Sequence, residues 1–426
     1  HLEDLVKSGQ VDEKLLDESV RNILRMKFRL GLFDNPYTEI QKEQPFYTAE
    51  SLQKAKNAAI EGAVLLKNDG VLPVKNTVKS VAVVGPLSDA QADQVGTWCF
   101  DAEPEHSVTP LTAIKELCGK DVKVIAEQGL TYSRDKSEDG IKKAVAAAVK
   151  ADVILFFAGE EAVLSGEARC RADISLPGAQ REMLKALKAT GKPVVMIVMA
   201  GRPLTIPEET EMADAVLYAF HGGTMAGPAL ADLLFGKAVP SGKLPVTLPR
   251  MVGQVPIYYA HKNTGRPASN ITLIDDIEIG AKQTSLGFTS YHLDAGDSPL
   301  FPFGYGLSYT TFKYGDVKLS KTNMNKGDVL IATCEVSNTG KYDADEVVQL
   351  YIRDKVGSLV RPVKELKDFK KVAIKAGQSR TVSFQITEKD LAYWNADMVK
   401  RAEAGEFEVW IAPSSAAGTS ASFILN

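Results

Sequence analysis

The sequence predicts an α/β domain with a mostly parallel sheet, followed by an all-β sandwich. From about residue 50 to residue 235, short β-branched runs alternate with amphipathic helices. Such continuous apolar strands are buried on both faces, which is typical of a parallel sheet covered by helices. Beyond Phe301 the pattern changes to short alternating strands separated by turn residues, as in an antiparallel sandwich. The length of 426 residues and the 45% apolar fraction allow two or three globular domains.

An isolated amphipathic helix is predicted over residues 12–30. Asp12 is its expected N-cap and Gly31 its expected left-handed end. The apolar positions that recur with helical spacing are Leu16, Val20, Ile23, Leu24 and Phe28. A lone helix cannot bury such a stripe, so we expect it to dock on a partner that the next forty residues do not offer.

The α/β domain is predicted from its alternating segments. A helix is expected over residues 58–66, ending at a turn formed by residues 68–70. The further expected strands are 80–84, 122–126, 153–157, 193–199 and 215–220, and the further expected helices are 140–151, 178–190 and 227–235. In such sheets, ligand-binding and catalytic residues usually lie at the carboxyl ends of the strands. The loop that follows Phe157 is the longest and most polar of them.

The remaining chain divides into a polar stretch and a β-rich end. Residues 263–300 are irregular and predict a linker or lid. The expected strands of the sandwich are 329–336, 347–353, 370–374, 381–386 and 407–411. These patterns give four segments, which we expect to be 1–45, 46–262, 263–300 and 301–426.

Composition and motifs exclude several classes of function. A net charge of −4 without a basic stripe argues against nucleic-acid binding. No apolar run of about 18 residues predicts a membrane span. Cysteines and histidines lack metal-site spacing, and no phosphate-binding glycine motif follows Val84, so neither a metal nor a cofactor is expected. A nucleophile elbow of the GxSxG type is also missing.

Seven segments in order resemble glycoside hydrolase family 3 β-glucosidases, in particular the periplasmic bacterial type. They are Arg29-Leu30-Gly31-Leu32-Phe33-Asp34, Gly62 to Asn68, Leu72-Pro73, Lys192-Pro193, Gly201-Arg202-Pro203, Pro240 to Pro245 and Phe303 to Thr310. The resemblance covers essentially the whole chain. It implies an α/β sandwich domain over 46–262 and a fibronectin type III-like sandwich over 301–426.

The same resemblance assigns residues 1–45 to the C-terminal helix and linker of a (β/α)₈ barrel. The family nucleophile, an aspartate on a barrel loop, would lie upstream of His1. The resemblance therefore implies that this chain supplies the acid/base loop only and is inactive by itself. It also implies a periplasmic or secreted protein, although the chain contains no signal peptide.

The candidate catalytic loop runs from Gly159 to Arg171. Retaining glycosidases need two carboxyl groups about 5–5.5 Å apart, one of which acts as acid and then base. By its position in the family loop, Glu167 matches the acid/base, with Glu160 as the alternative that could instead anchor the loop. Arg171 is expected to orient the loop or a carboxylate. It should not touch Glu167, because a close arginine would lower the pKa of the proton donor.

Two further residues follow strand ends. Trp98 could stack on a sugar ring, although packing in the core is the commoner role of a tryptophan. His221 is expected to be structural, with substrate contact as the lesser alternative.

Two other functions stay open at this point. One is a non-catalytic carbohydrate-binding or scaffolding protein built from the second and third domains. The other is a β-xylosidase or another family 3 glycosidase, because the sugar is selected largely by barrel loops. The expected partners are a β-glucoside or oligosaccharide substrate and the missing barrel domain, and a homodimer is one option for the oligomeric state.

Overall fold

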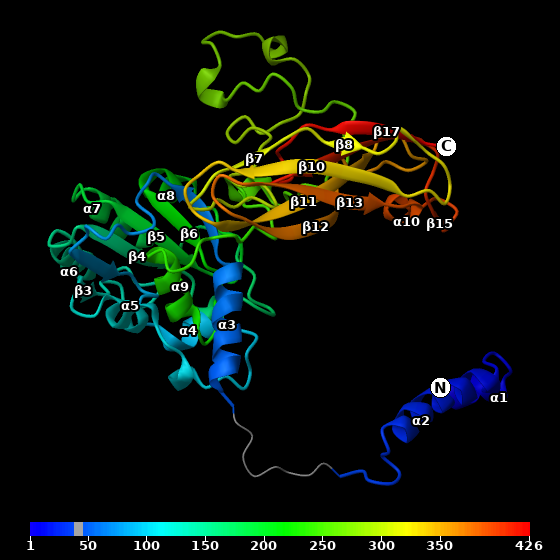
Figure 1. The fold of residues 1–426 in the computed structure, drawn as a ribbon, viewed down its shortest axis with the longest axis horizontal. Coiled ribbons are helices and arrows are strands. Elements are labelled where there is room, and N and C mark those ends of the chain that lie inside the picture. Colours follow the sequence, from blue (N-terminus) through cyan, green and yellow to red (C-terminus); the bar gives the residue numbers. More distant parts are fainter. Residues whose placement is uncertain (38–45) are drawn as a thin grey trace. The chain divides into compact units, whose positions relative to one another are not determined.

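The computed structural model describes residues 1–37 and 46–426, which include two compact units, His1–Thr48 and Ala49–Asn426 (Figure 1). Within the first unit lie helices α1 (Leu2–Lys7) and α2 (Glu13–Arg29). Part of the predicted linker, residues 38–45, lies outside the described residues.

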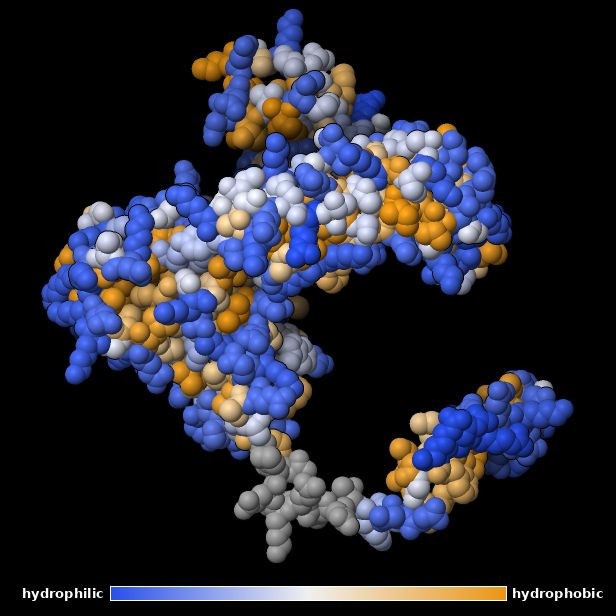
Figure 2. Space-filling model, in the orientation of Figure 1, coloured by the Kyte–Doolittle hydropathy of each residue, from blue (hydrophilic) through white to orange (hydrophobic). Residues whose placement is uncertain are grey.

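Helix α2 confirms the helix predicted near the N-terminus. The Asp12 carboxylate accepts a hydrogen bond from the Lys14 amide at 3.0 Å, which satisfies a free donor of the first turn. Gly31 adopts a φ of +69° just past the helix. No residue of α2 is buried, and most of its apolar side chains lie exposed on the first unit (Figure 2).

The α/β domain contains a six-stranded sheet with the order β1-β6-β5-β4-β2-β3. The strands are β1 (Val64–Asn68), β2 (Ser80–Val84), β3 (Lys123–Glu127), β4 (Val153–Gly159), β5 (Val194–Met199) and β6 (Ala215–Tyr218). All neighbouring pairs are parallel except β1 and β6. The mostly parallel sheet expected from the β-branched runs is therefore confirmed.

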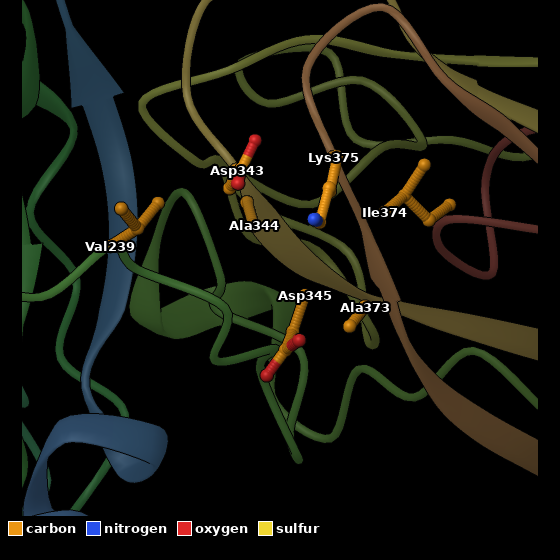
Figure 3. A pocket seen from close by; sticks show the side chains of 7 residues that line it. All are labelled: Val239, Asp343, Ala344, Asp345, Ala373, Ile374 and Lys375. Carbon is orange, nitrogen blue, oxygen red and sulfur yellow. The ribbon is translucent and has the colours of Figure 1, made fainter.

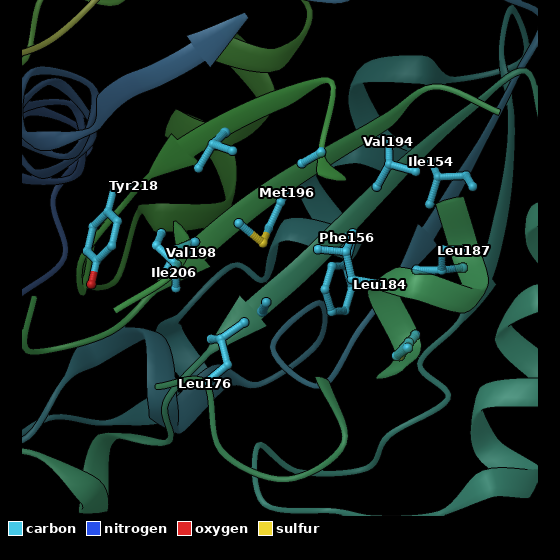
Figure 4. Packing of buried hydrophobic residues seen from close by; sticks show 14 of the residues in the cluster. Ile154, Phe156, Leu176, Leu184, Leu187, Val194, Met196, Val198, Ile206 and Tyr218 are labelled. Atoms are coloured by element: carbon cyan, nitrogen blue, oxygen red, sulfur yellow. The ribbon is translucent and has the colours of Figure 1, made fainter. Parts of the chain in front are cut away.

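Helices cover both faces of this sheet. The α-helices are α3 (Ala49–Gly62), α4 (Gln91–Val95), α5 (Pro110–Cys118), α6 (Glu138–Ala148), α7 (Gln180–Lys188), α8 (Pro207–Met212) and α9 (Ala226–Leu234), and short 3₁₀ turns are η1 (Pro104–His106), η2 (Ala162–Leu164) and η3 (Val252–Gln254). Alternate residues of β4 point into two separate cores: Ile154 and Phe156 pack with α6 and α7, and Leu155 and Phe157 with α5 and α9. Figure 4 shows Leu184 and Leu187 of α7 facing Phe156 and Ile154.

One predicted element is wrong in part. The expected helix over 58–66 is the end of α3 followed by strand β1. Val64, Leu65 and Leu66 are all buried, and β1 forms the antiparallel edge of the sheet beside β6. A short apolar run fits a buried strand as well as a helix, so its periodicity could not separate the two.

The C-terminal part is a β-sandwich of two sheets, as the alternating strands predicted. One sheet joins β13 (Ser379–Ile386), β10 (Leu330–Asn338), β7 (Phe312–Tyr314) and β8 (Lys318–Leu319). The other joins β12 (Glu365–Ile374), β11 (Ala344–Asp354), β16 (Gly405–Ala412), β17 (Ala421–Leu425) and β9 (Asn323–Met324). Helix α10 (Glu388–Leu391) and the pair β14 (Tyr393–Trp394) and β15 (Lys400–Arg401) complete it. Between the domains, residues 263–300 contain the turns η4 (Ile274–Asp276) and η5 (Gln283–Leu286) and an isolated bridge between His292 and Gly296.

Buried polar contacts join the α/β domain to the sandwich. Lys243 Nζ lies 3.2 Å from the Glu346 carboxylate, with side-chain exposures of 11% and 4%. The Tyr314 hydroxyl donates to Glu346 at 2.8 Å. The Leu307 amide donates to the Leu65 carbonyl of β1 at 2.8 Å, so the edge strand is covered by the segment that leads into the sandwich.

Candidate active site

The loop after β4 leaves the carboxyl end of the sheet through Gly159. This residue has a φ of +137°, and a Cβ atom there would lie 1.8 Å from the Met199 carbonyl of β5. The Glu160 amide then donates to the same carbonyl at 2.9 Å. The close approach fixes the direction in which the candidate catalytic loop starts.

Glu160 is the buried anchor of this loop. Its side chain is fully shielded from solvent, and its two carboxylate oxygens bind two arginines. Arg202 Nε donates to Oε2 at 2.9 Å, and Arg171 Nη1 donates to Oε1. Because both of its oxygens accept from arginines and the side chain is shielded from solvent, Glu160 is not accessible to a ligand.

Glu167 has the opposite environment. It is exposed at the tip of the loop, between Gly166 at a φ of +103° and Ala168 at a φ of +58°. Within residues 1–37 and 46–426, its carboxylate makes no hydrogen bond or ion pair. The positive φ values turn the backbone sharply at the tip, so Glu167 can meet a ligand that approaches from outside the α/β domain.

The first half of the loop is held by the segment after β2. The Ala162 amide donates to the Asp93 carboxylate at 2.9 Å. Burial raises the pKa of Asp93, and this hydrogen bond partly opposes the rise. Thr97 Oγ1 donates to the carbonyl of Ala162 and lies 2.9 Å from the carbonyl of Ser165. The loop and the segment that carries Trp98 are therefore packed together.

A second anchor lies at Glu161. Arg134 Nε and Nη2 donate to its two carboxylate oxygens, each at 2.9 Å, and Ser133 Oγ donates at 2.7 Å. The hydrogen bonds from Arg134 in particular lower the pKa of Glu161. Glu161 is thus a charged tether.

Trp98 is exposed beside this loop rather than buried in the core. Its exposed fraction is 61%, and its ring meets the more exposed Phe100 edge-on at 6.2 Å. A flat, accessible indole can stack on the C–H face of a sugar, which packing in the core would have prevented.

His221 lies beneath the site. A Cβ atom on Gly96 would lie 3.1 Å from the His221 Cβ, and one on Gly201 would lie 2.9 Å from its Nε2. Burial lowers the pKa of His221, although the negative charge of Glu160 acts in the other direction. A neutral, enclosed imidazole fits the structural role expected from the sequence.

Sequence reasoning missed the part played by Arg202. In the sequence, Arg202 was noted only as part of a segment that resembles the family. In the structure, its guanidinium contacts Glu160 and the backbone on both sides of Glu167. The available signal was its place directly after β5, because polar residues at the carboxyl ends of neighbouring parallel strands meet at one edge.

Other features of unit Ala49–Asn426 lie away from this loop. A cavity of about 370 Å³ is lined by Val239 and by the ends of β11 and β12, and Figure 3 shows Asp343, Asp345 and Lys375 around it.

Among the described residues, no group of three or more His, Cys, Asp or Glu side chains could hold a metal ion. Likewise, none of the described helices is long and apolar enough to cross a membrane.

Family models match both domains of the chain. Residues 63–309 match the glycosyl hydrolase family 3 C-terminal domain. Residues 346–415 match the fibronectin type III-like domain.

Curated relatives match nearly the whole chain. The periplasmic β-glucosidase of Salmonella typhimurium is 40% identical over 100% of this chain and 57% of its own length. A β-xylosidase of Formosa agariphila is 36% identical over 98% of this chain and 56% of its own length. The chain thus spans somewhat more than half the length of these relatives.

Solved structures agree with these matches. The β-glucosidase from Listeria innocua, in complex with isofagomine, superposes with a TM-score of 0.88 at 35% identity. That match covers 100% of this chain and 57% of the Listeria chain. From these matches and the observed domains, the chain belongs to glycosyl hydrolase family 3, of which it contains the C-terminal domain and a fibronectin type III-like domain.

Proposed function

We propose that this chain forms the acid/base side of the active site of a retaining, exo-acting β-glucosidase, and that Glu167 is the acid/base. The observation that supports this most is the contrast within one loop. Glu167 is exposed and unpaired within the described part of the chain, on a loop tethered by Glu160 and Glu161. The names of the Salmonella and Listeria relatives support β-glucoside hydrolysis as the reaction.

In this mechanism Glu167 first donates its proton to the glycosidic oxygen as that bond breaks. An aspartate from a barrel domain attacks the anomeric carbon and forms a glycosyl-enzyme. Glu167, now ionised, takes a proton from the water that hydrolyses this intermediate. A positioned acid/base of this kind contributes about 10²- to 10⁴-fold to the rate.

The neighbouring residues divide the supporting roles. Glu160 anchors the loop between its two arginines, and Arg171 binds one oxygen of that anchor instead of contacting Glu167. Within the described residues, no arginine forms an ion pair with Glu167. Trp98 offers its exposed ring to a sugar at the edge of the site.

The nucleophile is proposed to come from a barrel domain that precedes this chain. The matched relatives are longer than the chain, which spans 57% of the Salmonella protein. Helix α2 exposes Val20, Ile23 and Phe28, an apolar stripe that suits docking on a barrel. Residues 1–45, 46–262, 263–300 and 301–426 are accordingly proposed as barrel end and linker, α/β sandwich, linker or lid, and fibronectin-like domain.

Two properties of the whole enzyme are proposed from relatives. A periplasmic location is supported by the name of the Salmonella protein. Hydrolysis of β-xylosides is a second candidate activity, favoured by the Formosa agariphila β-xylosidase at 36% identity.

The test uses a chimera in which the N-terminal part of the Salmonella relative precedes residues 1–426, called the barrel-joined protein below. With Glu167→Gln, we expect kcat/KM for alkyl β-glucosides to fall by about 1,000-fold, because a poor leaving group needs its proton. Hydrolysis of 2,4-dinitrophenyl β-glucoside should lose far less in its first step, because that leaving group departs as an anion.

Glu161→Gln is the matched control, since it alters a carboxylate of the same loop that is tethered to Arg134. We expect no dependence on the leaving group in this variant. Equal losses on both substrates for Glu167→Gln, or a larger leaving-group effect for Glu160→Gln, would contradict the assignment of Glu167.

A further inference from the structure

Arg202 forms hydrogen bonds across the base of the loop that carries Glu167. Its Nη2 donates to the carbonyl of Leu164 and, at 2.8 Å, to the carbonyl of Arg169. These carbonyls lie on the two sides of the tip formed by residues 165–168. One guanidinium therefore bridges the chain where the tip begins and where it ends.

Glu167 depends on this closure for its position. Its carboxylate has no side-chain partner in the described ranges 1–37 and 46–426. Only the backbone of the tip can therefore direct it. The contact of Thr97 with Ser165 holds the first half of the tip, whereas Arg202 is the group that also reaches the second half, at Arg169.

Arg202 is itself fixed from three sides. Nε donates to the buried Glu160 carboxylate, and the buried Tyr218 hydroxyl donates to the Arg202 carbonyl at 2.5 Å. Gly201 lies directly under the tip, because a Cβ atom there would lie 2.3 Å from Ser165 Oγ. The Arg202 side chain is only 16% exposed.

We infer that Arg202 is a positioning residue for catalysis, with Glu160 as the group that orients it. We call the hydrogen bonds from Arg202 to the carbonyls of Leu164 and Arg169 the clamp. The clamp holds these two carbonyls at a fixed separation and thereby sets where the Glu167 carboxyl meets the glycosidic oxygen. This inference rests on the proposed role of Glu167 for its catalytic part, but the clamp itself is a property of this chain alone. A lysine cannot replace the arginine fully, because a single ammonium lacks the planar fork that reaches a carboxylate and two carbonyls together.

The clamp is tested by hydrogen–deuterium exchange on the 426-residue chain. The Arg169 amide donates to the Gly166 carbonyl within the tip. In Arg202→Met and in the milder Arg202→Lys, we expect this amide to exchange at least about tenfold faster, with unchanged exchange in β4 and β5. Arg181→Met is the matched control. Arg181 also pairs with a fully buried carboxylate, Glu209, but bonds to α8 and not to the loop.

A merely structural role for Arg202 would give a different pattern. Each methionine variant removes an arginine from a buried carboxylate, so both should lower the melting temperature, although Glu160 keeps Arg171 when Arg202 is replaced. Faster exchange of the Arg169 amide in the Arg202 variants supports the clamp. Unchanged exchange there in Arg202→Lys, or the same change in Arg181→Met, overturns it. If Arg202→Met does not fold, Arg202→Lys and Glu160→Gln answer the same question.

The catalytic part is tested in the barrel-joined protein. A displacement of the proton donor by about 1 Å can cost about 100-fold, so Arg202→Lys should lower kcat for alkyl glucosides by about that factor. For 2,4-dinitrophenyl β-glucoside the glycosylation step should change by less than about threefold, since that step needs little acid assistance. Equal loss on both substrates overturns a positioning role toward the acid.

The two failures are distinguishable. If Glu167→Gln shows no leaving-group dependence, the acid assignment fails, and exchange of the Arg169 amide still decides the clamp. If Glu167→Gln behaves as expected and Arg202→Lys does not, the positioning role fails alone.

Discussion

Two glutamates seven positions apart on one loop lie in opposite surroundings. Glu160 is buried between Arg171 and Arg202, and Glu167 is exposed without a partner in the described residues. The sequence offered both as candidates and ordered them by their place in the loop. It could not show the burial of Glu160, because one of its partners, Arg202, is 42 residues away. The loop could be predicted, whereas its anchoring required the three-dimensional contact.

At the same scale, we predict that the stability of the folded chain depends on pH through His221. Its folded-state pKa is lowered mainly by burial, so below about pH 6.5 the unfolded chain binds a proton that the folded chain does not. Stability from this residue is therefore complete above that pH and falls as the pH drops through the window below it. In His221→Gln, the decline in melting temperature between about pH 7 and pH 5 should be shallower than in the parent chain. A decline of the same steepness in both proteins would show that His221 does not titrate on unfolding.

At the scale of elements, the strands of the parallel sheet were predicted well because most of them are continuous, buried apolar runs. The predicted strand 80–84 coincides with β2, and β4 and β5 start at or next to their predicted positions. Strand β1 was mistaken for the end of a helix. It pairs with β6, about 150 residues later, and the local spacing of apolar residues does not reveal such a distant partner. Sheet pairing is a tertiary property, so edge strands are where such predictions fail.

The junction between β4 and the catalytic loop predicts a sensitive glycine. Gly159→Ala forces a side chain into a φ of +137° and against the Met199 carbonyl. The backbone strain alone should cost about 1–3 kcal/mol of unfolding free energy, and the collision adds to it. Gly253→Ala is the control, since nothing lies within 4 Å of a Cβ atom there. Urea unfolding that shows equal stability for both variants would contradict this view of the junction.

At the scale of the whole molecule, the sandwich is expected to brace the α/β domain through buried contacts. Lys243→Met leaves the Glu346 carboxylate buried without its cation and should cost about 3–5 kcal/mol of unfolding free energy. Lys371→Met removes two pairs that are more exposed, one with Glu61 between the same two domains and one with Asp345 inside the sandwich, and should cost less than about 1 kcal/mol. Similar losses in the two variants, measured by urea unfolding, would show that the buried pair is not the stronger connection.

The catalytic proposal also belongs to this scale, because the acid/base and the nucleophile would come from different domains. The isolated 426-residue chain is expected to leave aryl β-glucosides intact, because in the proposed mechanism the carboxylate that captures the sugar comes from a barrel domain. Detectable hydrolysis by the pure chain would contradict the division of the site between two domains.

Trapping with azide tests the role of Glu167 most directly. In the barrel-joined protein with Glu167→Ala, azide can enter the space of the lost carboxyl and attack the glycosyl-enzyme without needing a base. We expect the rate on 2,4-dinitrophenyl β-glucoside to rise with azide and the product to be β-glucosyl azide. If the rate does not rise and glucose remains the product, Glu167 is not the acid/base.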